Sequence, residues 1–120
     1  MSQSMREIKR IRVSWFDVEL AVQQMATEVP EDCTGIYGVP RGGLVLATML
    51  SYELGLPLLL APIEGCVVVD DIADSGETLK HYTKYVIMTM YHKDRSIVTP
   101  NVFYDTAEEN QWIVFPWEME

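Results

Sequence analysis

Two adjacent carboxylates, Asp70 and Asp71, come directly after a short apolar run, and a polar turn follows them. The run, Cys66–Val69, is small and β-branched, as in a strand that is buried on both faces. The turn, Asp74–Thr78, offers backbone N–H groups, two hydroxyl groups and one glycine, and we expect a helix to begin behind it. Carboxylates suit a cation, and such a turn suits a phosphate. The stretch therefore predicts a site for a ligand that carries both phosphate and Mg²⁺.

Chain direction places this acidic pair at the carboxyl end of its strand, where open α/β sheets bind their ligands. Two other classes of protein with such a pair fit less well. A receiver domain has its pair after the first strand, whereas this pair lies past the middle of the chain. A P-loop protein needs the sequence Gly-x-x-x-x-Gly-Lys-Ser/Thr, which is absent. Two carboxylates that only end a strand in solvent would not need the phosphate-type turn behind them.

A second motif, Pro40-Arg41-Gly42-Gly43, lies between a predicted strand and a predicted helix. Its glycines allow the backbone to approach an anion, and Arg41 can neutralise the anion's charge. Alone, such a turn is more often an ordinary loop. Its position one strand–helix–strand unit before the acidic pair favours a second anion site on the same edge of a sheet.

Hydrophobic patterning predicts the elements that carry these motifs. Ser14 and Asp17 form a capping-box pattern in front of an amphipathic segment. Strands alternating with helices in a short chain predict a single α/β domain with a mostly parallel sheet covered on both faces. We expect helices over 15–27, 44–54 and 77–85 and strands over 34–39, 58–61, 66–70, 86–91 and 102–105, followed by an apolar run over 112–115.

Composition narrows the class of partner. The 120-residue chain carries a net charge of −9, so long-range repulsion disfavours nucleic acid. Cys33 and Cys66 lie in unrelated contexts and suggest neither a metal-ligand pair nor a disulfide framework, which favours a reducing cytoplasm. The polar segment Met1–Arg12 lacks the apolar core of a signal peptide, and the longest apolar stretch, Leu54–Ile63, is too short to span a bilayer. We expect a soluble protein without a membrane partner.

The segment Val67–Thr78 resembles the phosphoribosyl-pyrophosphate signature of type I phosphoribosyltransferases: an apolar strand, two acids, two variable residues, then Asp, Ser or Thr, Gly, any residue and Thr. The resemblance implies that Asp70 and Asp71 hold the ribose hydroxyls and Mg²⁺, and that the following loop wraps the 5′-phosphate. Glu77 is then expected to face solvent, because its carboxylate would repel the phosphate. The donor-binding residues implied here are Asp70, Asp71, Ala73, Asp74, Ser75, Gly76, Glu77 and Thr78.

The loop Pro40–Gly43 resembles the pyrophosphate-binding loop of the same family, which often contains a cis peptide, here between Pro40 and Arg41. The resemblance assigns pyrophosphate binding to Pro40, Arg41, Gly42 and Gly43. Asp74 matches an acid that lies near the base and assists proton movement at N7 or stabilises the ribose cation. As an alternative, Asp74 is an ordinary helix cap.

The segments Tyr91–Lys93 and Asn110–Glu118 resemble the base-binding elements of the xanthine-guanine branch of the family. By resemblance, Lys93 donates to a purine O6, Trp112 stacks on the base, and the backbone carbonyl of Ile113 accepts from the group at C2. As alternatives, Trp112 and Trp117 are core residues and Lys93 is a solvated charge. His81 and His92 are expected at the surface without a role. The resemblance also implies a core over about 14–91 and a base-binding hood over about 92–118.

Family members usually carry a long flexible lid before the strand of the acidic motif, whereas here Leu58–Ala61 reaches Cys66 through Pro62–Gly65 alone. We therefore predict that the lid is deleted. Either another segment such as His92–Asn101 or a neighbouring subunit covers the site, or transfer is slow, or the protein binds nucleotide without turnover.

Taken together, the resemblance implies Mg²⁺-dependent transfer of the 5-phosphoribosyl group from its pyrophosphate to a 6-oxopurine, with Asp74 as the catalytic residue. The resemblance implies a homodimer or homotetramer. A lidless, non-catalytic nucleotide-binding protein is the alternative, and a receiver-like signalling module is the weakest hypothesis.

Overall fold

The protein is described here by a computed structural model that covers residues 7–118. Within that range no helix is long and apolar enough to cross a bilayer. The elements, in chain order, are β1 (Lys9–Arg12), α1 (Trp15–Ala26), β2 (Ile36–Gly38), α2 (Leu44–Leu54), β3 (Leu58–Leu59), β4 (Val67–Ala73), the 3₁₀ helix η2 (Leu79–Tyr82), β5 (Val86–His92), β6 (Val102–Thr106) and β7 (Gln111–Val114).

The main sheet has five strands in the order β3-β2-β4-β5-β6, and every neighbouring pair is parallel. The strand that bears the acidic pair, β4, therefore lies at the centre, with β2 on one side and β5 on the other. This arrangement confirms the predicted α/β fold with a mostly parallel sheet. It also places the carboxyl ends of β2, β4 and β5 at one edge, where the loops that follow them meet.

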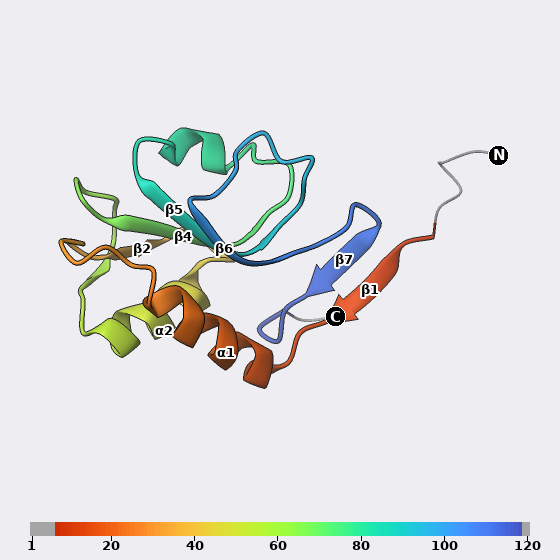
Figure 1. The fold of residues 1–120 in the computed structure, drawn as a ribbon, viewed down its shortest axis with the longest axis horizontal. Coiled ribbons are helices and arrows are strands. Elements are labelled where there is room, and N and C mark those ends of the chain that lie inside the picture. Colours follow the sequence, from red (N-terminus) through yellow and green to blue (C-terminus); the bar gives the residue numbers. More distant parts are fainter. Residues whose placement is uncertain (1–6, 119–120) are drawn as a thin grey trace.

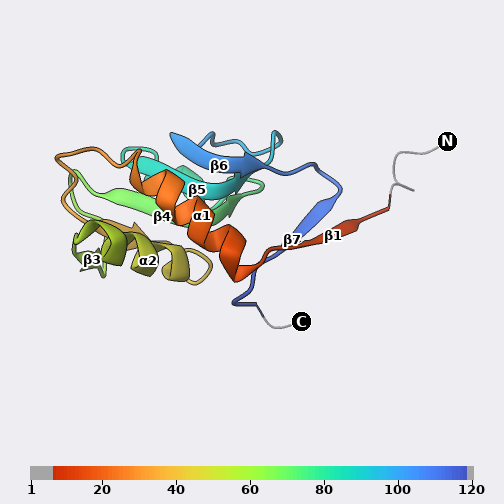
Figure 2. The same cartoon turned by 60° about the horizontal axis from the view of Figure 1, so that its bottom comes forward.

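Both faces of the main sheet are covered, although by different structures. Figures 1 and 2 show α1 and α2 together on one face, where Val67 and Val69 pack into the same cluster as helix residues such as Val22 and Leu50. The intervening Val68 points to the other face and packs with Leu79, Ile87 and Val98, which come from η2, β5 and a loop. The alternation of the two clusters along β4 confirms that its apolar residues are buried on both sides.

The helix predicted over 77–85 is wrong. Only the four residues Leu79–Tyr82 are helical, in a 3₁₀ turn without a side-chain cap. Aromatic and β-branched residues in this segment have modest helix propensity, and the chain must return to the sheet at Val86, which leaves no room for the long helix that would offset nucleation.

A second, two-stranded sheet pairs β1 with β7 in parallel, with Ile11 opposite Ile113. Figures 1 and 2 show the pair extending away from the main sheet. The sequence predicted no strand in the N-terminal segment, of which residues 1–6 lie outside the described range. Strand β7 carries Trp112 and Ile113, two of the expected base-binding residues, so β1 supports that region from the opposite end of the chain.

The capping box at the start of α1 is confirmed. Ser14 Oγ accepts from the Asp17 amide at 3.0 Å, and the Ser14 amide donates to Asp17 Oδ2 at 2.9 Å. We expect Ser14→Ala to lower the free energy of unfolding by about 1 kcal/mol, because the Asp17 amide loses its partner and the box is opened. Denaturant unfolding of the variant and the wild type measures this loss. Thr48→Ala, on the exposed surface of α2, is the control and should be neutral, since its hydroxyl bonds only within its own helix.

Candidate active site

The acidic pair lies inside β4 rather than at its end. We predicted that the strand stops at Asp70, but its pairing with β5 continues as far as Ala73 opposite His92. Both carboxylates are only partly exposed. The backbone amide of Asp71 donates to Asp70 Oδ1 at 2.9 Å, which orients the Asp70 carboxylate.

Burial and mutual repulsion disfavour two negative charges at this position. Burial first, and then the charge of Asp71, raise the pKa of Asp70 to about 8. Burial also raises the pKa of Asp71, and the charge of Glu118 acts in the same direction. A cation between the carboxylates would remove this penalty.

The loop after β2 packs directly on the acidic pair. Its peptide between Pro40 and Arg41 is cis, as the sequence predicted. A Cβ atom at Gly42 would overlap the Asp71 carboxylate, and one at Gly43 would overlap the carbonyl oxygen of Val69. Only glycine allows this approach. The predicted pyrophosphate loop therefore lies against the predicted metal ligands.

The turn after β4 surrounds a small cavity of about 90 Å³ that Asp70 and Asp74 also line. Gly76 has a φ of +86°, which favours glycine, and the Glu77 amide donates to Ser75 Oγ at 3.2 Å. Glu77 is exposed, as expected, and its carboxylate accepts from Lys80 Nζ at 2.7 Å. No α-helix begins behind this turn, so an anion bound here would depend on the amides and hydroxyls of the turn and not on a helix dipole. The cavity is lined by Asp70, Ile72, Ala73, Asp74, Ser75, Gly76, Glu77, Thr78 and Leu79.

A second cavity, of about 110 Å³, brings together the expected base-binding residues. Lys93 is 3% exposed, and its Nζ lies 3.7 Å from Asp74 Oδ1 and 3.4 Å from the Glu109 carbonyl oxygen. Lys93 is therefore a buried ion-paired residue and not a solvated charge. The lining consists of Asp71, Ile72, Asp74, Lys93, Trp112, Ile113, Phe115 and Glu118.

The two tryptophans near the C-terminus differ. Trp112 is 54% exposed beside the second cavity, so the core alternative does not hold for it. Trp117 stacks on Phe115 with ring centroids 4.9 Å apart and also contacts Trp15 at 5.9 Å, so it is partly buried and packs against the core. A free aromatic face at Trp112 is available to a planar ligand.

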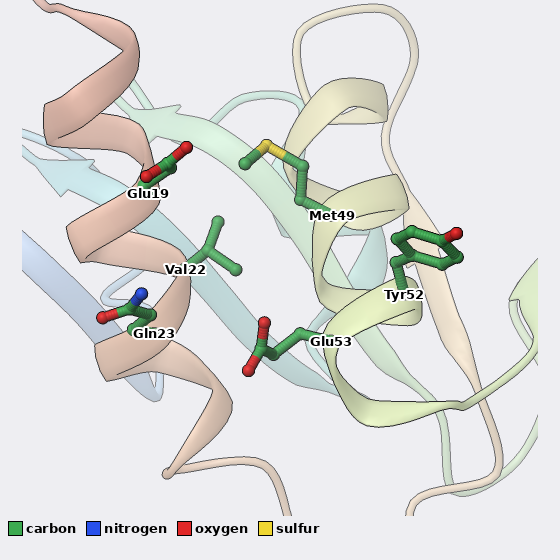
Figure 3. Close-up of a pocket in the computed structure, with 6 residues that line it drawn as sticks. All are labelled: Glu19, Val22, Gln23, Met49, Tyr52 and Glu53. Carbon is green, nitrogen blue, oxygen red and sulfur yellow. The ribbon is translucent and has the colours of Figure 1, made fainter.

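A larger hollow of about 380 Å³ lies between α1 and α2, and none of its lining residues belongs to these motifs (Figure 3). Glu19, Gln23, Met49 and Glu53 are among its six lining residues. Its lining contains no basic side chain and no glycine-rich loop, so its chemistry suits neither phosphate nor a metal–phosphate complex. The candidate site is therefore the edge where the acidic pair lies.

Sequence reasoning missed two features of the site. Arg95 donates to Asp74 Oδ1 through Nε at 2.8 Å and also through Nη2. His92, expected at the surface, is 7% exposed and packs on Phe103 with ring centroids 4.8 Å apart; neither of its ring nitrogens has a hydrogen-bond partner among the described residues. Nothing in the local sequence distinguishes these residues from ordinary loop and strand residues.

Within residues 7–118 no group of three or more His, Cys, Asp and Glu side chains is arranged to hold a metal ion. The pair Asp70 and Asp71 still suits Mg²⁺, which commonly takes one or two protein carboxylates and completes its shell with water and substrate phosphates.

Comparison with known proteins agrees with this geometry. The chain is 29% identical to xanthine-guanine phosphoribosyltransferase of Idiomarina loihiensis over 138 residues, covering 89% of this chain and 86% of that protein. Among solved structures, purine phosphoribosyltransferase from Pyrococcus horikoshii has a TM-score of 0.81 at 28% identity, covering 92% of this chain and 95% of the other. The xanthine-guanine-hypoxanthine enzyme of Helicobacter pylori has a TM-score of 0.79 at 21% identity, with 91% and 93% covered. No family model matches the chain.

The chain therefore has the type I phosphoribosyltransferase fold. Within that class, its sequence and structure are related to those of the purine phosphoribosyltransferases.

Proposed function

We propose that the protein transfers the 5-phosphoribosyl group from phosphoribosyl pyrophosphate to N9 of a 6-oxopurine and releases pyrophosphate. The observation that carries this proposal is the position of Asp74, which lines both the phosphate-type cavity and the cavity with Lys93 and Trp112. A group that joins phosphate to a planar base would span the two cavities with its reacting carbon near Asp74.

The roles proposed for the residues follow their chemistry. Ser75, Gly76 and Thr78 bind the 5′-phosphate, and Arg41 with its adjacent glycines binds pyrophosphate. Asp70 and Asp71 hold the ribose hydroxyls and Mg²⁺; when bound, the ion neutralises charge on the departing pyrophosphate. The unfavourable proximity of these two carboxylates supports a cation at this position. Asp74 accepts the proton that the base loses.

On the base side, Lys93 is proposed to donate to O6 of the purine, Trp112 to stack on the ring, and the carbonyl of Ile113 to accept from the group at C2. A lysine donor favours a 6-oxo over a 6-amino purine, because an amino group cannot accept its hydrogen bond. Names of the relatives support purines as the substrate class.

The proposed transfer is tested by incubating the purified protein with Mg²⁺, donor and each of guanine, xanthine, hypoxanthine and adenine. Nucleotide is expected with the first three and little with adenine. The proposal is refuted if none of the bases gives nucleotide while a relative with the long lid does so under the same conditions.

The side chain of Lys93 gives a sharper test. We expect Lys93→Met to lower kcat/KM for guanine by about 10- to 100-fold, because a charged hydrogen-bond donor to the base is lost. The ratio of kcat/KM for guanine to kcat/KM for adenine should therefore fall towards one. Lys84→Met, at an exposed position near Tyr85, is the control and should leave both rates unchanged. Equal losses with both bases would contradict the role at O6.

A non-catalytic nucleotide-binding protein is the second candidate, and the short connection from β3 to β4 favours it. Only residues 60–66 join the two strands. The alignment with the Idiomarina relative runs over 138 residues, more than the 120 in this chain, so that protein has residues within the matched region that are missing here. If the missing residues are a lid, water would reach the ribose cation. Thermal stabilisation by guanosine 5′-monophosphate without turnover would support this candidate.

We further propose a single domain over residues 1–120 that acts in the cytoplasm on small molecules, without nucleic acid or membrane partners, and assembles as a dimer or tetramer. Free, buried thiols at Cys33 and Cys66 and the net charge of −9 are compatible with the compartment and the partners. Light scattering on the purified protein measures the assembly directly.

A further inference from the structure

The loop from residue 93 to residue 101 packs directly over the phosphate-type turn. The Ile97 amide donates to the Ser75 carbonyl oxygen at 2.9 Å. A Cβ atom at Gly76 would lie 2.7 Å from Ser96 Oγ and 2.8 Å from the Val98 nitrogen. Side chains of this loop are therefore held within reach of any anion that the turn binds.

Two cations from this loop converge on one carboxylate oxygen. Arg95 donates twice to Asp74 Oδ1, and Lys93 Nζ lies 3.7 Å from the same atom. Loop 93–101 also carries the exposed carboxylate Asp94, so the two segments have no net positive charge, but at Asp74 Oδ1 two cations face one carboxylate oxygen. The other carboxylate of the turn, Glu77, is paired with Lys80.

The two cations differ in freedom. The side chain of Lys93 is 3% exposed, whereas that of Arg95 is 49% exposed. A half-exposed ion pair contributes little to stability, so Arg95 can leave Asp74 at small cost. A guanidinium also matches phosphate in a bidentate geometry, and a phosphate monoester carries more charge than a carboxylate.

We propose that Arg95 is an exchangeable phosphate ligand: it pairs with Asp74 in the free protein and moves to the 5′-phosphate of the bound donor or nucleotide. This inference rests on the proposed function, because it takes the turn at Ser75–Thr78 as the site of that phosphate. The exchange also releases Asp74 Oδ1 from Arg95 when ligand is present and leaves Lys93 as its neighbouring cation.

Calorimetric titration with guanosine 5′-monophosphate and with guanosine separates the phosphate from the base. Arg95→Gln is expected to weaken binding of the nucleotide by about tenfold and to leave binding of guanosine unchanged. The affinity of Arg95→Lys for the nucleotide should lie between those of the wild type and Arg95→Gln. Lys84→Gln makes the same change of charge on the surface and should match the wild type. Equal weakening of nucleotide and nucleoside, or none, would overturn the proposal.

A double-mutant cycle tests the exchange itself. Asp74→Asn removes the internal competitor, so nucleotide should bind more tightly, and Arg95→Gln should then cost more than it does in the wild type. If Arg95 acted only through long-range charge, the two effects would add. Additive effects, or a smaller cost in the Asp74→Asn background, would show that Arg95 does not exchange.

The outcomes also separate this inference from the proposed reaction. Arg95-dependent nucleotide binding without turnover would reject transfer and support the exchange. Turnover together with nucleotide binding that does not depend on Arg95 would support transfer and reject the exchange. A protein that binds neither nucleotide nor donor would overturn both.

Discussion

Replacing Asp70 with asparagine is expected to remove most phosphoribosyl transfer while making the metal-free protein more stable. Transfer should fall by at least about 100-fold, because a ligand to the cation that neutralises pyrophosphate is lost. Stability should rise because the asparagine side chain would keep an oxygen for the Asp71 amide and carry no charge beside Asp71. The gain in the free energy of unfolding at pH 8 is expected to be on the order of 2 kcal/mol.

The pH dependence of stability gives an independent check. The pKa of Asp70 is about 8 in the folded protein, above the usual value of an aspartate in an unfolded chain. Between about pH 4 and pH 8 the folded state thus keeps a proton that the unfolded state has lost. The free energy of unfolding of the wild type should fall as pH rises through that window, and Asp70→Asn should flatten the fall.

Denaturant unfolding with chelator at several pH values measures this effect, and steady-state assays measure transfer. Glu64→Gln, on an exposed turn away from the site, controls for the change of net charge and should alter neither quantity. Millimolar Mg²⁺ with donor should raise the free energy of unfolding of the wild type at pH 8 and leave that of Asp70→Asn unaffected. A variant that is less stable at pH 8, or that still transfers at the wild-type rate, would contradict the assignment.

The centre of the sheet was predictable because its signal is local. Val67, Val68 and Val69 are β-branched, bounded by a turn and buried on both faces, and a central parallel strand needs all three properties. The end of that strand was not predictable. Asp70 and Asp71 are poor strand formers, and only the continued pairing with β5 extends the strand past them.

The site was predictable as motifs and less so as contacts. The glycines at positions 42 and 43 signalled a close approach, and they do lie against Asp71 and Val69. The burial of Lys93 was not foreseen, because lysine is rarely buried unless paired and its partner, Asp74, is distant in sequence. The pairing of β1 with β7 joins opposite ends of the chain, and no local pattern reports such a contact.

Two neighbouring glycines should respond differently to the same added methyl group. At Gly42 the three atoms nearest to the Cβ would all belong to the carboxylate end of Asp71, a group that can rotate away. We expect Gly42→Ala to fold with nearly wild-type stability and to bind Mg²⁺ and donor more weakly, since the displaced carboxylate no longer faces its partner Asp70.

At Gly43 the added Cβ would meet backbone, and this change should have the largest effect on stability. The obstructing atoms are the Val69 carbonyl oxygen, the Val39 nitrogen at 2.9 Å and the Asp70 Cα at 3.0 Å, none of which can rotate away. The φ of Gly43 is −85°, so the backbone conformation itself suits alanine and the overlap is the cause of any loss. We expect Gly43→Ala to lower the free energy of unfolding by about 3 kcal/mol or more.

Gly55→Ala is the matched control for this experiment. Gly55 ends α2 at a φ of +67° with no atom within 4 Å of an added Cβ, so alanine there suffers backbone strain alone. Its cost should be about 1 kcal/mol, without effect on transfer. Denaturant unfolding of both variants shows which of them loses more free energy of unfolding. If Gly43→Ala were as stable as Gly55→Ala and still bound donor, the loop would not be packed on the central strand, and the assignment of Pro40–Gly43 to pyrophosphate would lose its structural basis.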